Sequence, residues 1–446
     1  MKKHILFILG ALGFFASQAQ LDLGTHFLSN TLQSNLTNPA AFSDYKINVS
    51  LLPSVYAGVY NSAFRPSSVL EKREQDFYLD MDELVSRIGS EGWNVQGDVR
   101  VETFSFAFRA KKFQVGISHG FRVHMNQHLP QAMLRFGWGG NAQFVGQTIN
   151  IAPSLNMLAY QEYGVNVGYQ VSKRLTLGTR LKYLLGTATY ATANSRASIY
   201  TDPVGYELTG ETDYRINTSG LPESDINAGD FFDFDEFELD LSGPNQGFAF
   251  DLGASLDLTD KVTIQTSILN IGKINWKDNV YNYVSNGITT FEGLDFQPII
   301  DEGTLDTEEI LDTIAQTFEF ETTSENFSTT LPTSFYLSGT YEVRPKLTVG
   351  ALFFAQGFHS ELTTAVALNV RKDFGKSFSL GAQYANVEGG ANNLGLSTTV
   401  QLGPVQIYAT SDNIVPIFKP LRGQNVNFRF GMNLVFGKIE GEESNK

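Results

Sequence analysis

Cysteine is absent from this sequence of 446 residues, and its absence excludes several kinds of chemistry. The chain can hold no disulfide, thiolate metal site, thiol nucleophile or lipidated amino-terminal cysteine. Basic residues are also scarce, because 32 Lys and Arg stand against 47 Asp and Glu and give a net charge of −15. General nucleic-acid binding needs a basic footprint, so we expect no nucleic-acid partner.

Long apolar runs are missing as well: no stretch reaches the roughly 18 apolar residues of a transmembrane helix. The first segment has Lys2 and Lys3, then an apolar run over residues 5–15, then the small residues Ser17 and Ala19. This order predicts a secretory signal peptide over residues 1–19, cleaved before Gln20. We therefore expect the mature chain to leave the cytoplasm.

Apolar and polar residues alternate along most of the remaining chain, a period typical of β-strands. Within 113–123, for example, Phe113, Val115 and Ile117 share one parity, and Gln114 and Gly116 the other. Each such strand has one apolar and one polar face. A soluble β-sandwich also shows this pattern. The apolar parity of the clearest runs carries no charge, which favours a face in lipid, where a mid-depth Lys or Arg costs about 2–4 kcal/mol.

Segmentation by this period gives about fourteen strands, with short turns and longer connections in alternation, as in bacterial outer-membrane barrels. The segments are 45–59, 99–110, 112–123, 158–171, 174–187, 246–259, 261–276, 332–344, 346–357, 361–372, 376–387, 392–402, 404–411 and 424–437. Each unpaired backbone group in hydrocarbon costs several kcal/mol, so such a sheet must close. The sequence therefore predicts an all-β fold, a transmembrane antiparallel β-barrel over residues 45–437, with a polar tail at 438–446.

Residues 20–44 precede the first strand and are too irregular to form one. Their motif Asn38, Pro39 and Ala40 combines a rigid turn with small side chains that permit close packing. We interpret this segment as a plug that folds into the lumen, the interior of the barrel.

The negative charge is concentrated in two long insertions, 188–245 and 277–331. Residues 223–240 hold eight acids and residues 278–330 hold twelve, and neither stretch has a Lys or Arg. Two short helices are predicted over the outer mouth, because Asp80 to Glu83 and Asp306 to Glu309 resemble capping boxes.

The charged residues on the polar parity are the main candidate site. The residues expected to face the lumen are Arg100, Glu102, Arg122, Glu162, Arg180, Lys182, Asp251, Asp257, Arg371 and Arg429. Mutual pairing that stiffens a plugged interior is one interpretation. A polar path or a clamp for a substrate headgroup is the other.

No catalytic, cofactor-binding or metal-binding residue is predicted. The acidic stretch 230–240 has carboxylates that Ca²⁺ prefers. It lacks a glycine-punctuated calcium loop, so we favour a solvated acidic strand pair or a partner-facing rim. His119, His124 and His128 lie within ten residues, and their spacing does not force them to converge on a metal. No nucleophile, phosphate loop or dinucleotide motif stands out, so we do not expect an enzyme.

Several short motifs carry a resemblance to known barrels. They are Asn38–Ala40, Gly247–Gly253, Ile271–Trp276, Gly403–Tyr408 and Ser411–Asn413. Together they resemble an outer-membrane β-barrel family of Bacteroidota without an assigned substrate (DUF5723-like). The Asn-Pro-Ala segment is also distantly similar to the long-chain fatty-acid transporter/PorV superfamily. These resemblances imply a fourteen-stranded barrel with an amino-terminal plug in the outer membrane.

The leading functional hypothesis is uptake or passage of small amphipathic or hydrophobic molecules across the cell outer membrane, with membrane lipid as the surroundings. The alternative is an accessory or structural barrel that does not transport. Such a barrel would bind proteins of a secretion or surface complex through its acidic loops.

Overall fold

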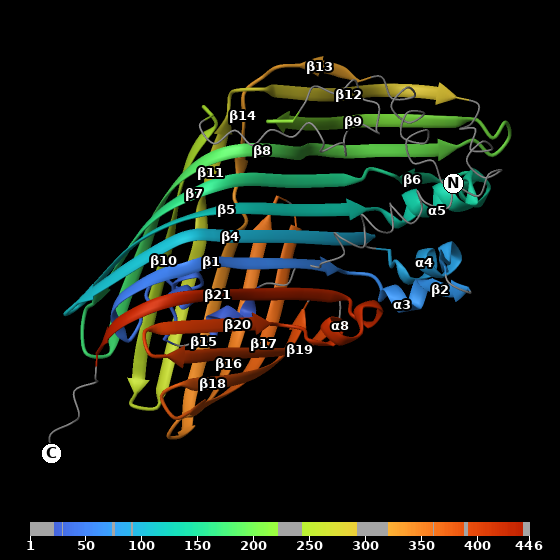
Figure 1. The fold of residues 1–446 in the computed structure, drawn as a ribbon. Helices are drawn as coiled ribbons and strands as arrows, with labels where there is room; N and C mark the ends of the chain where they lie inside the picture. The colour runs from blue at the N-terminus through green and yellow to red at the C-terminus, as the bar shows by residue number, and fades with distance from the viewer. Residues whose placement is uncertain are drawn as a thin grey trace.

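In the computed structural model, residues 22–28, 30–73, 76–90, 92–221, 243–291, 320–359, 361–387 and 391–439 are described. They form a closed antiparallel barrel of fourteen strands, because β1 pairs with both β4 and β21 and closes the ring (Figure 1). This confirms the predicted fold class. The wall strands, in order around the ring, are β1 (Tyr45–Asn61), β4 (Trp93–Ala110), β5 (Phe113–Leu129), β7 (Ser154–Gln170), β8 (Leu175–Thr201), β10 (Gln246–Thr259), β11 (Val262–Trp276), β15 (Thr333–Arg344), β16 (Leu347–Phe358), β17 (Glu361–Phe374), β18 (Phe378–Val387), β19 (Ala391–Leu402), β20 (Val405–Ser411) and β21 (Asn425–Lys438).

The wall extends on one side well past the closed ring. β8 has 27 residues, pairing with β10 up to Leu185 and with β9 (Leu208–Ser219) from Thr189 onward. β9 in turn pairs with β12 (Val280–Phe291), and β12 with β13 (Glu321–Thr323), which gives the long upper edge in Figure 1. The sequence segmentation placed this region in loops and missed these strands. The remaining short strands are β2 (Leu70–Arg73), β3 (Asp76–Leu79), β6 (Thr148–Asn150) and β14 (Phe327–Thr330).

Apolar side chains cover the outside of the barrel. Leu181, Val366 and Leu368 are 62%, 53% and 58% exposed, while their strand neighbours Arg180 and Asn369 face inward and are buried. This is the alternation that the sequence predicts, with the apolar parity on the outer surface.

The alternation reverses at one point in β11. Asn270 adopts a left-handed φ of 62°, and the pairing of β10 with β11 shifts register between Phe250 and Leu252. An extra residue in one strand of a pair is a β-bulge, and it moves the following side chains to the opposite face. Before the bulge Ile268 lies outside; after it Trp276 is fully buried and Lys273 is exposed.

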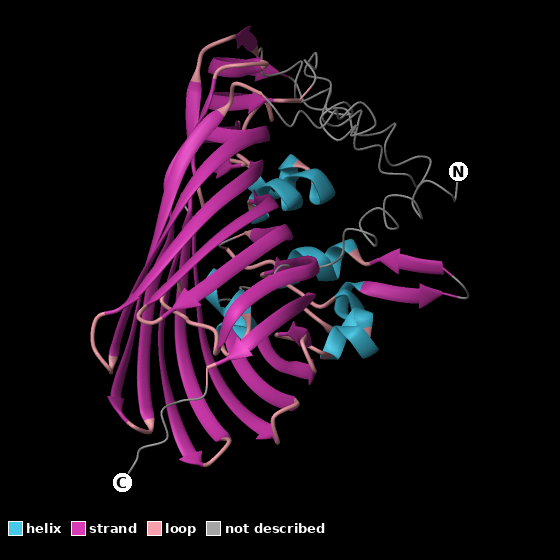
Figure 2. Cartoon of the chain, turned by 60° about the vertical axis from the view of Figure 1, so that its left-hand side comes forward, coloured by secondary structure: helices cyan, strands magenta, loops and turns pink. Residues whose placement is uncertain are grey.

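Short helices gather near the outer end of the barrel (Figure 2). α4 (Met81–Arg87) confirms one predicted helix, because its N-cap Asp80 accepts a hydrogen bond from the Glu83 N–H at 2.9 Å. The other predicted helix, at Asp306 to Glu309, lies outside the described residues. The remaining helices there are α3 (Pro66–Val69), α5 (Gln131–Gly139), η2 (Asn141–Phe144), α8 (Val415–Phe418) and η4 (Pro420–Arg422). Within the described part of the chain, no helix is long and apolar enough to cross a membrane.

Candidate functional site in the barrel lumen

Residues 22–44, called the plug below, lie inside the barrel (dark blue in Figure 1). The plug contains the single-turn helix α2 (Leu23–His26) and the 3-10 helix η1 (Leu32–Leu36), and most of its described residues are buried. His26 shows how the plug contacts the wall. Its ring stacks on Tyr336 with centroids 5.4 Å apart, and its Nε2 lies 2.7 Å from Ser338 Oγ.

The motif Asn38, Pro39 and Ala40 packs against glycines of the wall. A β-carbon at Gly178 would collide with the carbonyl group of Pro39, and one at Gly253 would lie 2.8 Å from Pro39 Cδ. The Asn38 side chain donates to the Ala254 carbonyl at 3.2 Å. Glycines on the inward parity of β8 and β10 therefore make room for the plug backbone.

Two acidic residues fix the first turn of the plug. Asp22 binds Arg429 of the last strand, with 2.6 Å between Oδ2 and Nη2. Asp412, just after β20, accepts hydrogen bonds from the backbone N–H groups of Leu23 and Gly24 at 3.0 and 2.6 Å. All three charged side chains are buried. Buried polar contacts thus hold the start of the plug at this point, beside the apolar packing of Leu23.

A second group of charges lies on β5, β7, β8 and β10. Lys182 Nζ is 2.8 Å from Asp251 and 3.5 Å from Glu162, and Glu162 is also 3.4 Å from Arg122. Arg180 donates to the Asn35 carbonyl of the plug at 3.0 Å. Buried ions need such partners, because an unpaired charge in a dry interior is costly.

One side of the outer lumen, from β7 round to β18, is lined by apolar clusters, which the sequence interpretation did not anticipate. One buried cluster joins wall and plug residues: Leu23, Phe27, Tyr60, Leu269, Tyr336, Leu352, Phe354, Ala365, Ala367, Ala385 and Val387. Another combines Leu158, Tyr160, Leu184, Ala249, Ile274, Trp276, Val280, Leu331 and Phe358. A polar lining was expected from parity, but the inward parity of β16 carries Leu352 and Phe354 as well as Gln356.

Most of the charges expected to face the lumen do lie there. Arg122, Glu162, Arg180, Lys182 and Asp251 form the network just described, and Glu102 is buried at 4% exposure.

The remaining charges divide between the plug and the rim. Arg100 lies 2.5 Å from Asp98 and 3.7 Å from Asp22, on the side where Arg429 binds the plug. Arg371 lies 3.4 Å from the Phe27 carbonyl. Asp257 is the exception, because it is exposed near a short turn and accepts a hydrogen bond from Thr263.

Three buried acids of the lumen were missed by the sequence prediction. Asp22 lies within the predicted plug, Asp98 precedes the predicted strand start at 99 by one residue, and Asp412 belongs to a motif noted only for its resemblance. Parity counted back to residue 98 would have found Asp98. Nothing local in the sequence indicates that Asp412 meets the plug.

The three histidines do not converge on a metal. His119 lies on the outward parity and binds Thr103 Oγ1 through Nδ1 at 2.7 Å, whereas His124 faces Asp98 at 3.7 Å and His128 binds Asn94 at 2.6 Å. Among the described residues, no group of three His, Asp or Glu side chains could hold a metal ion. The acidic stretch 230–240 considered for Ca²⁺ falls outside the described residues.

Comparison with known families decides which group of barrels this is. The model of DUF5723, a family of unknown function, matches residues 39–412. The chain belongs to the DUF5723 family. The family resemblance expected from the motifs is thereby confirmed, and a Bacteroidota origin remains a prediction. A search of curated proteins finds no match to this DUF5723 member.

Several solved structures are similar in shape at low identity. The Ralstonia pickettii toluene transporter TbuX is 9% identical with a TM-score of 0.42, covering 91% of this chain and 94% of its own. The monoaromatic hydrocarbon channel CymD is 10% identical with a TM-score of 0.43, covering 95% and 99%. A Pseudomonas aeruginosa FadL homologue is 12% identical with a TM-score of 0.39, covering 93% and 95%.

Proposed function

We propose that this DUF5723 barrel resides in the bacterial outer membrane and passes small hydrophobic or amphipathic molecules through its lumen, with the plug as the gate. The closed wall supports the location, because its apolar outer face belongs in lipid and its backbone groups pair within the ring. The predicted signal peptide agrees with this location.

The apolar clusters on one side of the outer lumen carry the proposal. A barrel that only passed polar solutes would line this region with polar side chains. Instead, Leu23 and Phe27 of the plug pack into a cluster with Leu352 and Phe354 of the wall. Displacement of the plug would expose this apolar surface to an incoming molecule, and apolar burial provides the binding free energy.

The absence of cysteine permits a direct test by a reversible tether. A β-carbon at Gly24 would lie 3.4 Å from Thr410 Cβ, close to the ~3.5–4.5 Å of natural disulfides. The Asp412 carboxylate, 2.8 Å from that β-carbon, must shift slightly. We expect Gly24→Cys/Thr410→Cys to admit the hydrophobic probe N-phenyl-1-naphthylamine into host cells when reduced and to exclude it when oxidised.

A matched pair of cysteines within the wall provides the control. A β-carbon at Gly116 would also lie 3.4 Å from Ala107 Cβ, and both residues belong to the wall. Gly116→Cys/Ala107→Cys should therefore show the same probe uptake when oxidised and reduced. Uptake by the plug-tethered variant that does not respond to oxidation, or equals that of cells without the barrel, would contradict a plug-gated path.

The sheet of β9 and β12 beyond the closed ring favours a second candidate function, partner binding without transport. β9 and β12 continue past the closed ring, where Ile288 is 71% and Val204 87% exposed. A deletion of 278–330 would remove β12 and also β14, which pairs with β11. Replacement of 292–319 alone by a Gly-Ser linker is the sharper test. Loss of co-purifying proteins, with probe uptake unchanged, would favour the accessory role.

A further inference from the structure

The outer surface of the wall carries a groove that plays no part in the proposed path. It has a volume of about 950 Å³ and spans β5, β7, β8, β10 and β11. The strands beneath it are hydrogen-bonded to one another without a break in the ring. The groove therefore opens to the surroundings of the barrel and is separate from the lumen.

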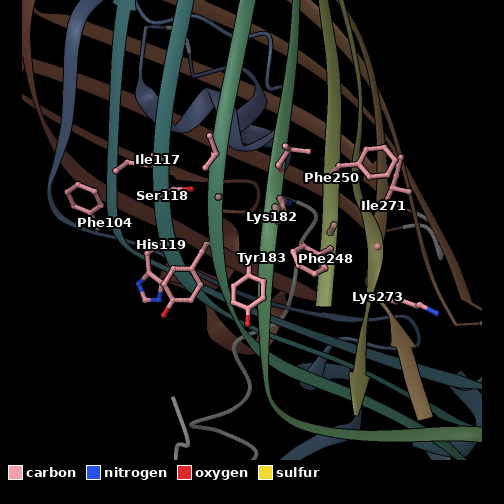
Figure 3. A pocket seen from close by; sticks show the side chains of 16 residues that line it. Phe104, Ile117, Ser118, His119, Lys182, Tyr183, Phe248, Phe250, Ile271 and Lys273 are labelled. Carbon is pink, nitrogen blue, oxygen red and sulfur yellow. The ribbon is translucent and has the colours of Figure 1, made fainter. Parts of the chain in front are cut away.

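The side chains of the groove form rows across directly paired strand positions. One row, called the aromatic row, is His119, Tyr163, Tyr183, Phe248 and Lys273. Its neighbouring rings lie 4.5, 6.3 and 5.4 Å apart. The next row toward the short turns, called the aliphatic row although it includes Phe250, is Ile117, Val165, Leu181, Phe250 and Ile271. Figure 3 shows His119, Tyr183 and Phe248 at one level, Ile117, Phe250 and Ile271 at the next, and Lys273 at the edge.

The next row toward the outer end is Phe121, Gln161, Leu185, Gln246 and Asn275. Three of its five residues are amides, of which Gln161 is buried. From the short turns toward the outer end, the groove therefore passes from the aliphatic row to the aromatic row and then to a row rich in amides. Aromatic girdles mark the boundary between hydrocarbon and headgroups in membrane barrels. The aromatic row therefore lies at the headgroup level of the outer leaflet.

Lys273 reaches this surface only because of the bulge at Asn270. Without the bulge its parity would be that of inward Ser267 and Leu269. Lys273 is exposed, and no described carboxylate pairs with it. A lysine at the end of an aromatic row, without an acidic partner, provides a site for an anion at headgroup depth.

We infer that this groove binds a phosphate-bearing acylated lipid of the outer leaflet, with an acyl chain along the aliphatic row and the phosphate at Lys273. The inference rests on the proposed membrane location and adds a specific ligand. The charge of Lys273 selects a lipid phosphate over a neutral lipid. The next row toward the short turns, from Val115 to Ile268, is mostly aliphatic, which fits a chain that continues into the bilayer.

Native mass spectrometry of the full barrel in a neutral detergent tests the inference, with diphosphoryl lipid A as the probe. We expect the wild type to hold one lipid A, and the same lipid without its phosphates to bind more weakly. Lys273→Gln should weaken lipid A binding about fivefold, since a basic residue near an anionic surface contributes ~1 kcal/mol. Phe248→Ala should also weaken it, because Phe248 is 72% exposed in the groove.

Two control variants separate this groove from general effects. Lys376→Gln removes an exposed lysine at a short turn, and Phe353→Ala removes a 41% exposed phenylalanine from β16, two strands beyond the groove. Both should bind lipid A as the wild type does. Equal losses in controls and groove variants, tight binding of the dephosphorylated lipid, or a dimer that blocks the groove would each overturn the inference.

The same variants distinguish this inference from the proposed transport. Lys273→Gln leaves the lumen intact, so uptake of N-phenyl-1-naphthylamine should be unchanged. If lipid A binds as expected and no uptake occurs, only the transport proposal fails. If uptake responds to the plug tether and lipid A does not bind, only the lipid site fails.

Discussion

Asp251 holds the bulge of the neighbouring strand: its Oδ1 accepts a hydrogen bond from the backbone N–H of Asn270 at 2.7 Å. Lys182 binds both residues, with Nζ 2.8 Å from the Asp251 carboxylate and 2.6 Å from Asn270 Oδ1. A buried ion pair of the lumen thus fixes the register change that places Trp276 inside and Lys273 outside.

This arrangement predicts an asymmetry between single and double variants. Lys182→Met leaves the fully buried Asp251 without its closest cation, and breaking a buried pair costs about 3–5 kcal/mol. Lys182→Met/Asp251→Asn removes both charges, while the Asn oxygen can still accept from the Asn270 N–H. Urea unfolding in detergent should show the double variant to be the more stable of the two. An equal loss of unfolding free energy in the two variants, or a larger loss in the double variant, would argue that Asp251 does not need Lys182.

The packing of Trp276 gives a second prediction. A β-carbon at Gly186 would lie 2.6 Å from the Trp276 ring atoms Cζ3 and Cη2. The ring is fixed, because its Nε1 donates to Thr329 Oγ1 at 2.8 Å. Gly186→Ala should therefore lower the free energy of unfolding by about 1–3 kcal/mol, the usual range for overpacking. Gly339→Ala, with no atom within 4 Å of the new β-carbon, is the matched control and should be neutral. Equal effects of the two substitutions would exclude the ring contact as the cause.

Alternation predicted the wall and failed where a local irregularity or a distant partner decides the outcome. All fourteen wall strands follow from the period of two, because lipid imposes that period on every strand. Lys273 and Trp276 escape it, since one extra residue at Asn270 reverses the parity. A bulge is set by side-chain contacts such as that of Asp251, which the sequence does not reveal.

In the lumen, too, the sequence predicted positions but not the partners of the residues at those positions. Arg429 could be placed inward from parity, and the plug could be recognised from Asn38 to Ala40. Their partners could not, because Asp22 and Arg429 are 407 residues apart in the chain. The apolar side of the outer lumen depends on Leu352 and Phe354, and large apolar residues on both parities of β16 hide which face meets the plug.

Seating of the plug should depend on the glycines beneath it. A β-carbon at Gly178 would be 2.5 Å from the Ala40 nitrogen and closer still to the Pro39 carbonyl. The plug backbone cannot rotate away as a side chain could, so Gly178→Ala should displace it. We expect uptake of N-phenyl-1-naphthylamine to increase, with the barrel still folded by its heat-modifiable gel mobility. Gly357→Ala, which meets no atom within 4 Å, should leave uptake unchanged. Unchanged uptake in Gly178→Ala would show that this contact does not hold the plug.

The Asp22–Arg429 pair provides the sharpest test of whether buried polar contacts hold the plug in the lumen. Both side chains are almost fully buried, and Arg429 Nη1 also donates to Ser54 at 3.0 Å. Arg429→Gln leaves the Asp22 carboxylate without its closest cation and should favour release of the plug by about 3 kcal/mol. Asp22→Asn should act similarly, because it leaves Arg429 without its carboxylate partner. The double variant should lose less than the sum of the two, since the residues interact directly. Hydrogen exchange of the amides in 22–44 measures plug release separately from unfolding of the wall. Strict additivity, or faster exchange in the wall strands as well, would mean that Arg429 stabilises the barrel rather than the plug.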